Sequence, residues 1–123
     1  MRDGFVVMRG YFSGRDLVEI LRQVDRFVRD VVPRVPRERV FFEDRSEPRS
    51  LKQIQHMGAY DPWFRQLAEE GPPRALAERL LDGPVVPMNL QYFDKPAGHS
   101  LPTPPHQDGH YFMLDPCEAV TLW

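Results

Sequence analysis

The chain has 123 residues, of which 41% are hydrophobic and 28% charged, and its formal net charge is −2 at pH 7. This length predicts one small domain, and the near-neutral charge argues against a nucleic-acid or membrane-surface partner. No signal-peptide pattern is present, and no segment approaches the roughly 20 apolar residues of a membrane span. The single cysteine, Cys117, excludes an internal disulfide, so the sequence favours a protein of the reducing cytoplasm.

The N-terminal part of the chain predicts a strand followed by a long helix. Residues 5–9 are β-branched and aromatic and lie between glycines, which is typical of a strand. Ser13 is the predicted N-cap of the helix, with Asp16 three residues further on, and Pro33 and Pro36 are predicted to end it. The apolar residues between these limits recur at helical spacing: Leu17, Ile20, Leu21, Val24, Phe27, Val28 and Val31.

The middle of the chain alternates short elements. Residues 39–44 (RVFFED) predict a strand, whereas 50–57 (SLKQIQHM) fit a short strand and a helical turn equally well. Residues 61–71 begin with Asp-Pro, an N-cap and first-turn pair, and end at a glycine, so we predict a helix there. Residues 73–83 predict a second short helix that a glycine also ends.

The last third of the chain predicts strands. Residues 84–95 resemble a strand, and residues 106–114 and 119–123 are predicted as the last two extended segments. Five of the 13 prolines lie between positions 96 and 116, where they stiffen the loops. We therefore expect helices to dominate residues 1–83 and strands to dominate residues 84–123, with no internal domain boundary.

The stretch PTPPHQDGHYF, residues 102–112, places two histidines and an aspartate within five positions. In a strand His106, Asp108 and His110 would share one face. A His-x-Asp pair supplies two of the three ligands of a facial triad, which leaves open positions on Fe(II). Gly109 favours a bulge that would turn His110 aside, so we assign His110 to substrate or to the metal's surroundings. The pair alone is a weak signal, because a neighbouring His and Asp more often form a surface hydrogen bond.

Three segments resemble the phytanoyl-CoA dioxygenase-like family. GFVVMRGYFSGRDLVEILRQVD is similar to the family's usual opening, and LLDGPVVPMNLQYFDKPAG with PPHQDGHYF is similar to its metal-binding core. The resemblance runs from about Gly4 to Trp123 and implies an α+β fold, a partial double-stranded β-helix (jelly-roll) with amphipathic N-terminal helices outside it. It also implies a dioxygenase that uses Fe(II), 2-oxoglutarate and O2 to hydroxylate a small molecule, with ascorbate as an auxiliary reductant.

The same resemblance implies roles for individual residues. His106 and Asp108 match the proximal iron ligands, and the aspartate favours hydroxylation, because halogenating relatives carry a small residue there. Met88 and Trp123 match positions that border the 2-oxoglutarate pocket, and Lys52 matches a lysine that contacts this co-substrate. The ordinary structural interpretations of these last three are core filler, a packed aromatic and an exposed cation.

The family pattern further requires a distal histidine and an arginine for the far carboxylate of 2-oxoglutarate, and residues 1–123 supply neither. We therefore expect a single incomplete oxygenase domain that is inactive as it stands and is poorly soluble or oligomeric. Two other classes stay open. One is a non-catalytic module that completes its fold by strand exchange with a copy or a partner. The other is a zinc or cupin-like site built from His106, Asp108 and His110. His99 is expected to lie in a surface or lid loop.

Overall fold

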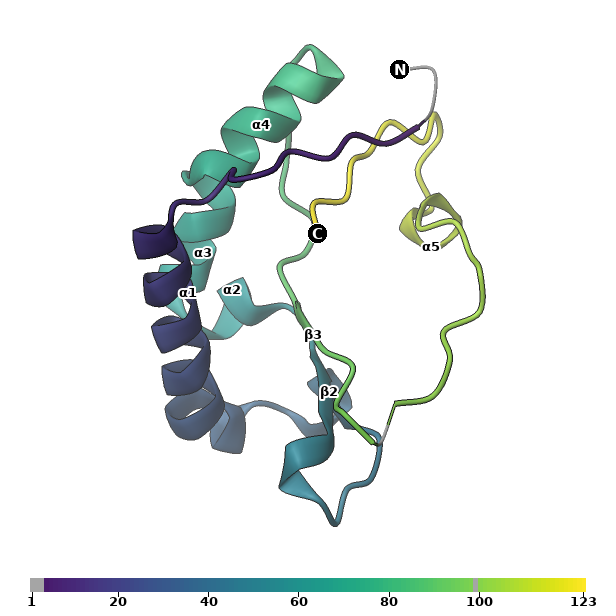
Figure 1. The fold of residues 1–123 in the computed structure, drawn as a ribbon. Helices are drawn as coiled ribbons and strands as arrows, with labels where there is room; N and C mark the ends of the chain where they lie inside the picture. The colour runs from purple at the N-terminus through teal and green to yellow at the C-terminus, as the bar shows by residue number, and fades with distance from the viewer. Residues whose placement is uncertain (1–3, 99) are drawn as a thin grey trace. The chain divides into compact units, whose positions relative to one another are not determined.

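The computed structural model describes residues 4–98 and 100–123, so the expectation for His99 lies outside the described residues. By its internal contacts the chain divides into two compact units, Met1–Arg34 and Val35–Trp123 (Figure 1). The predicted α+β class is confirmed, because helices accompany a three-stranded antiparallel sheet. None of the helices in the described parts of the chain is long and apolar enough to cross a membrane.

The first unit is built on one helix, α1, at Gly14–Arg26. The helix continues through a π-helical turn at Phe27–Val31 and a 3-10 turn at Val32–Arg34. Ser13 is its N-cap as predicted: the backbone N–H of Asp16 donates to Ser13 Oγ, while the Ser13 N–H donates to Asp16 Oδ2. This reciprocal pair satisfies backbone donors that the first turn of a helix leaves without partners.

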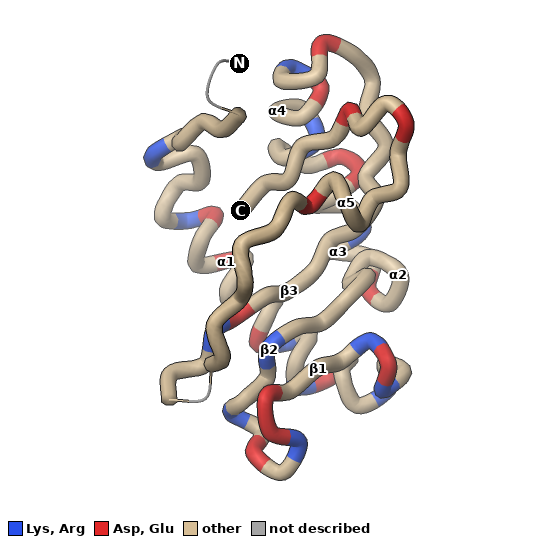
Figure 2. Tube along the Cα trace, turned by 90° about the vertical axis from the view of Figure 1, so that its right-hand side faces the viewer, with Lys and Arg blue, Asp and Glu red and all other residues tan. Residues whose placement is uncertain are grey.

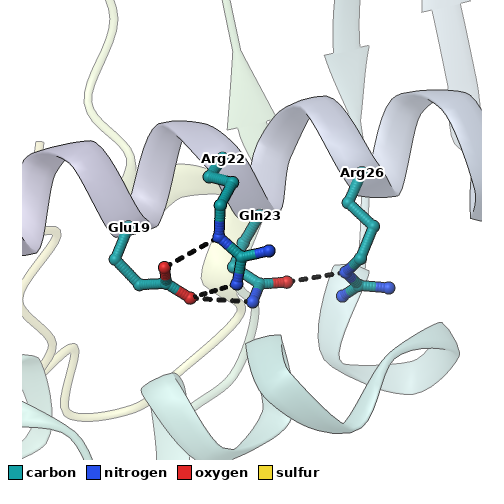
Figure 3. Close-up of polar contacts among 4 residues, drawn as sticks. All are labelled: Glu19, Arg22, Gln23 and Arg26. Atoms are coloured by element: carbon teal, nitrogen blue, oxygen red, sulfur yellow. Dashed lines mark hydrogen bonds and ion pairs between the residues drawn. The ribbon is translucent and has the colours of Figure 1, made fainter.

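Charged and polar side chains also link successive turns of α1 (Figure 3). Arg22 donates to the Glu19 carboxylate from Nε and Nη2 at 2.9 and 2.7 Å. Gln23 donates to the same carboxylate at 2.9 Å and accepts from Arg26 Nε at 2.6 Å. Pairs three and four residues apart face each other on a helix, so these contacts support the helical conformation.

The strand predicted at residues 5–9 is wrong. Residues 5–8 have no regular structure, and a turn follows at positions 9 and 10. Phe5 and Val7 are 72% and 69% exposed. Strand propensity describes how well a side chain fits a pleated, half-buried surface. A segment with high propensity still forms no strand unless a neighbouring strand pairs with it.

The sheet of the second unit has the order β1-β2-β3, with β1 at Val40–Phe42, β2 at Leu51–Ile54 and β3 at Tyr92–Phe93. The strand predicted at 39–44 is thus confirmed, and the ambiguous 50–57 segment forms β2 and then enters a helix at residue 57. Phe41 pairs with Gln53 and Phe42 with Leu51, so Lys52 is an extra residue in β2. Such a bulge changes the direction of the side chain that it carries.

Three short helices follow β2: α2 at Met57–Tyr60, α3 at Pro62–Glu69 and α4 at Pro72–Leu81. The two predicted helices, α3 and α4, are confirmed. Asp61 is the N-cap of α3, as its place before a proline predicts. The buried apolar side chains of this unit come from β1, β2, α2, α3 and the segment before β1: Val35, Val40, Ile54, Met57 and Phe64.

The strands predicted for the last third are mostly wrong. Only Tyr92–Phe93 of residues 84–95 form a strand, residues 119–123 form none, and the 106–114 segment contains a short helix, α5, at Gly109–Phe112. Strands need neighbours, and the described part of the chain offers β3 only one, β2. The double-stranded β-helix is therefore an implication of the family resemblance and is not an observed sheet.

Candidate metal and co-substrate site

The imidazole of His106 and the carboxylate of Asp108 face each other. His106 Nε2 lies 3.2 Å from Asp108 Oδ1, and the two side chains are 41% and 33% exposed. A turn follows directly: the N–H of His110 donates to the Gln107 carbonyl, and the N–H of Tyr111 donates to the Asp108 carbonyl. The sequence led us to expect this convergence on a strand, whereas the structure achieves it just before α5.

A backbone carbonyl determines which nitrogen of His106 carries hydrogen. His106 Nδ1 lies 2.9 Å from the Pro104 carbonyl oxygen, and a carbonyl can only accept, so Nδ1 bears the hydrogen. With the hydrogen on Nδ1, a neutral ring would present the lone pair of Nε2 to Asp108. Two electron-rich atoms at this distance repel each other unless a cation, a proton or a metal ion, lies with them. Histidines that bind metals generally hold their second nitrogen by such a hydrogen bond.

The second oxygen of the Asp108 carboxylate has its own partner. Thr121 Oγ1 donates to Asp108 Oδ2 at 2.9 Å. Asp108 therefore turns Oδ1 toward His106 and keeps Oδ2 on the hydroxyl. Six ligands at about 2.1 Å around a metal ion have neighbours about 3.0 Å apart, close to the observed separation of Nε2 and Oδ1. One imidazole and one carboxylate are donors that Fe(II) accepts, so these two residues fit the iron that the sequence predicts.

Aromatic rings pack around the pair. The ring of Tyr111 meets the rings of His106 and His110 edge to face, at centroid distances of 5.9 and 5.3 Å. A Cβ on Gly109 would come within 2.7 Å of Cys117 Sγ, so a larger residue at this position would have to displace the Cys117 side chain. Over residues 4–98 and 100–123 no three His, Cys, Asp or Glu side chains gather as a potential metal site, and His110 packs on Tyr111 instead.

The three residues expected to line the 2-oxoglutarate pocket have different surroundings. Lys52 Nζ lies 2.9 Å from Glu43 Oε1, and this hydrogen bond holds the pKa of Glu43 below its ordinary 4.5. Trp123 is 84% exposed and packs edge to face on Phe93 of β3 at 5.9 Å. Met88 is 54% exposed and precedes β3 in a stretch without regular structure. The described contacts thus place Lys52 and Trp123 beside β3, each on its own partner.

The sequence did not indicate three of the partners seen here: the Pro104 carbonyl, the Thr121 hydroxyl and the Glu43 carboxylate. The signals available were slight. Thr121 is the one polar residue in the AVTLW segment, and Glu43 begins a stretch of mixed charge between β1 and β2 (Figure 2). Each partner acts through a contact that depends on folding, so residue type alone does not reveal it.

The sequence matches a family model described as Phytanoyl-CoA dioxygenase (PhyH) over residues 1–123. No curated protein matches the chain. No solved structure matches it either. Because the family model covers every residue from 1 to 123, the chain belongs to the phytanoyl-CoA dioxygenase (PhyH) family, whose members are oxygenases of the Fe(II)- and 2-oxoglutarate-dependent type.

Proposed function

We propose that the chain carries two iron ligands, His106 and Asp108, of an Fe(II)- and 2-oxoglutarate-dependent hydroxylase with a double-stranded β-helix fold. The observation that carries the proposal is the arrangement of four atoms. His106 Nε2 and Asp108 Oδ1 converge at 3.2 Å, while Nδ1 and Oδ2 are each held by another group. Both side chains thus have one atom directed at a shared point and the other fixed away from it.

His106 and Asp108 would contribute different properties to metal binding. Asp108 contributes a negative charge that offsets the charge of the cation, and His106 contributes a neutral nitrogen whose orientation the Pro104 carbonyl fixes. When bound, iron supplies the activation of O2 coupled to the oxidative decarboxylation of 2-oxoglutarate to succinate and CO2. Because Asp108 fills the position that halogenating relatives leave open for halide, we propose hydroxylation of the substrate.

We propose that Lys52, Trp123 and Met88 contribute to the site of 2-oxoglutarate, as their match to the family implies. An ammonium group is a suitable partner for a co-substrate carboxylate, and Lys52 carries one on the bulge of β2. Here the Glu43 carboxylate pairs with that ammonium, so a bound co-substrate would replace Glu43 as the carboxylate partner of Lys52. The exposed ring of Trp123 and the exposed side chain of Met88 offer apolar surface beside it.

We propose a cytoplasmic enzyme that acts on a small molecule, with ascorbate as an auxiliary reductant and with no nucleic-acid or membrane partner. The free, exposed Cys117 suits a reducing compartment.

Exposed apolar side chains in the second unit, among them Val86 at 86% and Met113 at 92%, favour a second candidate function, strand exchange between copies of the chain. The mass of the protein in solution separates a monomer from such an assembly.

Co(II) titration tests the two ligands. Co(II) binds a given set of donors more tightly than Fe(II), so it suits a weak site. We expect His106→Ala and Asp108→Ala each to weaken Co(II) binding at least about tenfold, because each removes one of two protein donors. His110→Ala is the matched control and should bind as the unsubstituted chain does. Equal affinity in all four proteins would remove His106 and Asp108 from the proposal, and purified protein fully loaded with zinc would favour the zinc site instead.

A further inference from the structure

The hydroxyl of Thr121 contacts the carboxylate of Asp108 from a distant part of the sequence. The hydrogen bond joins Thr121 Oγ1 to Asp108 Oδ2 at 2.9 Å and spans 13 positions. Asp108 lies immediately before α5, whereas Thr121 lies in the irregular C-terminal segment. The contact therefore ties two segments together at the side chain that faces His106.

The Thr121 hydroxyl limits the ways in which the Asp108 carboxylate could bind a metal. Free carboxylates bind cations through one oxygen or through both, and they rotate between these arrangements. A hydrogen bond from a hydroxyl to an ionised oxygen is stronger than one between neutral groups. With Oδ2 held on Thr121, only Oδ1 is directed at the point that His106 Nε2 shares. A carboxylate that binds through one oxygen leaves more positions on the metal for other ligands.

We infer that Thr121 is a positioning residue, which holds Asp108 so that it binds the metal through Oδ1 alone. The inference rests on the proposed function, because it assumes that Asp108 is a metal ligand. Thr121 itself touches no metal in this arrangement. Its effect passes through the carboxylate, in the way that hydrogen-bonded partners of metal ligands generally act.

The test compares Thr121→Val with Thr121→Ser in Co(II) titrations of the full chain. Valine has the shape of threonine without the hydroxyl, and serine keeps the hydroxyl without the methyl group. We expect Thr121→Val to weaken Co(II) binding about 10- to 100-fold, the range found for such partners. We also expect it to shift the visible absorption of bound Co(II), because an unrestrained carboxylate changes the ligand number. Thr121→Ser should keep both the affinity and the spectrum of the unsubstituted chain.

A matched control and a double variant show whether the effect passes through Asp108. Thr103→Val alters an exposed threonine in the loop before His106 and should change neither readout. Thr121→Val added to Asp108→Ala should cause no further loss of Co(II) affinity, because the carboxylate that it positions is gone. A Thr121→Val protein with unchanged affinity and spectrum would overturn the inference, as would a Thr121→Ser protein that behaves like Thr121→Val.

The outcomes also separate this inference from the proposed function. If Asp108→Ala weakens binding while Thr121→Val does not, Asp108 is still a ligand and only the role of Thr121 is lost. If neither His106→Ala nor Asp108→Ala changes Co(II) binding, the proposed ligands are wrong and the inference falls with them.

Discussion

The ammonium of Lys52 and the carboxylate of Glu43 form an ion pair of 2.9 Å in which both side chains are partly buried, at 32% and 11% exposure. The pair joins the bulge of β2 to the residue that follows β1. It gives the one lysine of the candidate site a partner within the protein. A co-substrate carboxylate at Lys52 would therefore compete with Glu43.

Removal of the Lys52 cation should raise the pKa of Glu43. The hydrogen bond from Lys52 is the largest cause of the lowered pKa, so in Lys52→Met we expect the pKa of Glu43 to return toward 4.5. Because the folded-state pKa lies below its ordinary value, the pair stabilises the fold above about pH 4.5, and this stabilisation disappears as the pH falls through the lowered pKa. An NMR titration of the Glu43 carboxyl carbon measures the shift. Lys95→Met, which removes the other lysine, should leave the titration unchanged; an unchanged titration in Lys52→Met would show that another group sets the pKa.

The Glu19 contacts in α1 should make the helix sensitive to acid (Figure 3). Hydrogen bonds from Arg22 and then Gln23 lower the pKa of Glu19 from 4.5 to about 2. Stability from this carboxylate is thus fully present above about pH 4.5 and is lost as the pH falls toward 2. We expect Glu19→Gln to lower the thermal midpoint slightly at pH 7, since the pair is exposed, and the difference from the unsubstituted chain to vanish in acid.

Circular dichroism at several pH values measures that difference. Glu38→Gln alters an exposed glutamate in a 3-10 turn and serves as the control. A gap between Glu19→Gln and the unsubstituted chain that stays constant down to pH 2 would contradict the assignment.

Asp61 should be worth more to stability than an ordinary surface aspartate. Its Oδ1 accepts from the N–H groups of Trp63 and Phe64 at 3.0 and 3.3 Å, and the residue is only 4% exposed. We expect Asp61→Ala to destabilise the protein by about 0.5–2 kcal/mol, the usual range for a lost N-cap. Asp61→Asn keeps an oxygen acceptor and should lose less. Urea unfolding measures both variants, and equal midpoints for alanine and the unsubstituted chain would exclude a capping role.

Local signals in the sequence predicted the local structure well. The N-caps Ser13 and Asp61 were both predicted correctly, because a cap joins a side chain to backbone groups two or three residues away. The strand at 5–9 and most of the strand at 84–95 were wrong for the opposite reason. A strand exists only when another strand supplies hydrogen bonds, and a single segment of sequence does not specify that neighbour.

In the candidate site too, contacts between near neighbours in sequence were predicted and contacts between distant residues were not. The spacing of His106 and Asp108 predicted that their side chains would point the same way, and they face each other in the observed irregular segment instead of in the expected strand. Thr121 and Glu43 reach their partners across 13 and nine positions. No local periodicity marks such contacts, so the groups that hold Asp108 and Lys52 in place became apparent only in the folded chain.

The donors available in this chain limit its expected turnover. A facial triad holds iron through three protein ligands, whereas the described residues bring together only His106 and Asp108. We expect the 123-residue chain, supplied with Fe(II), 2-oxoglutarate, O2 and ascorbate, to form succinate no faster than its His106→Ala variant. The variant is the appropriate baseline because iron and ascorbate in solution degrade 2-oxoglutarate without a protein site. A monomer whose succinate formation clearly exceeds that of His106→Ala would show that two protein ligands are enough here.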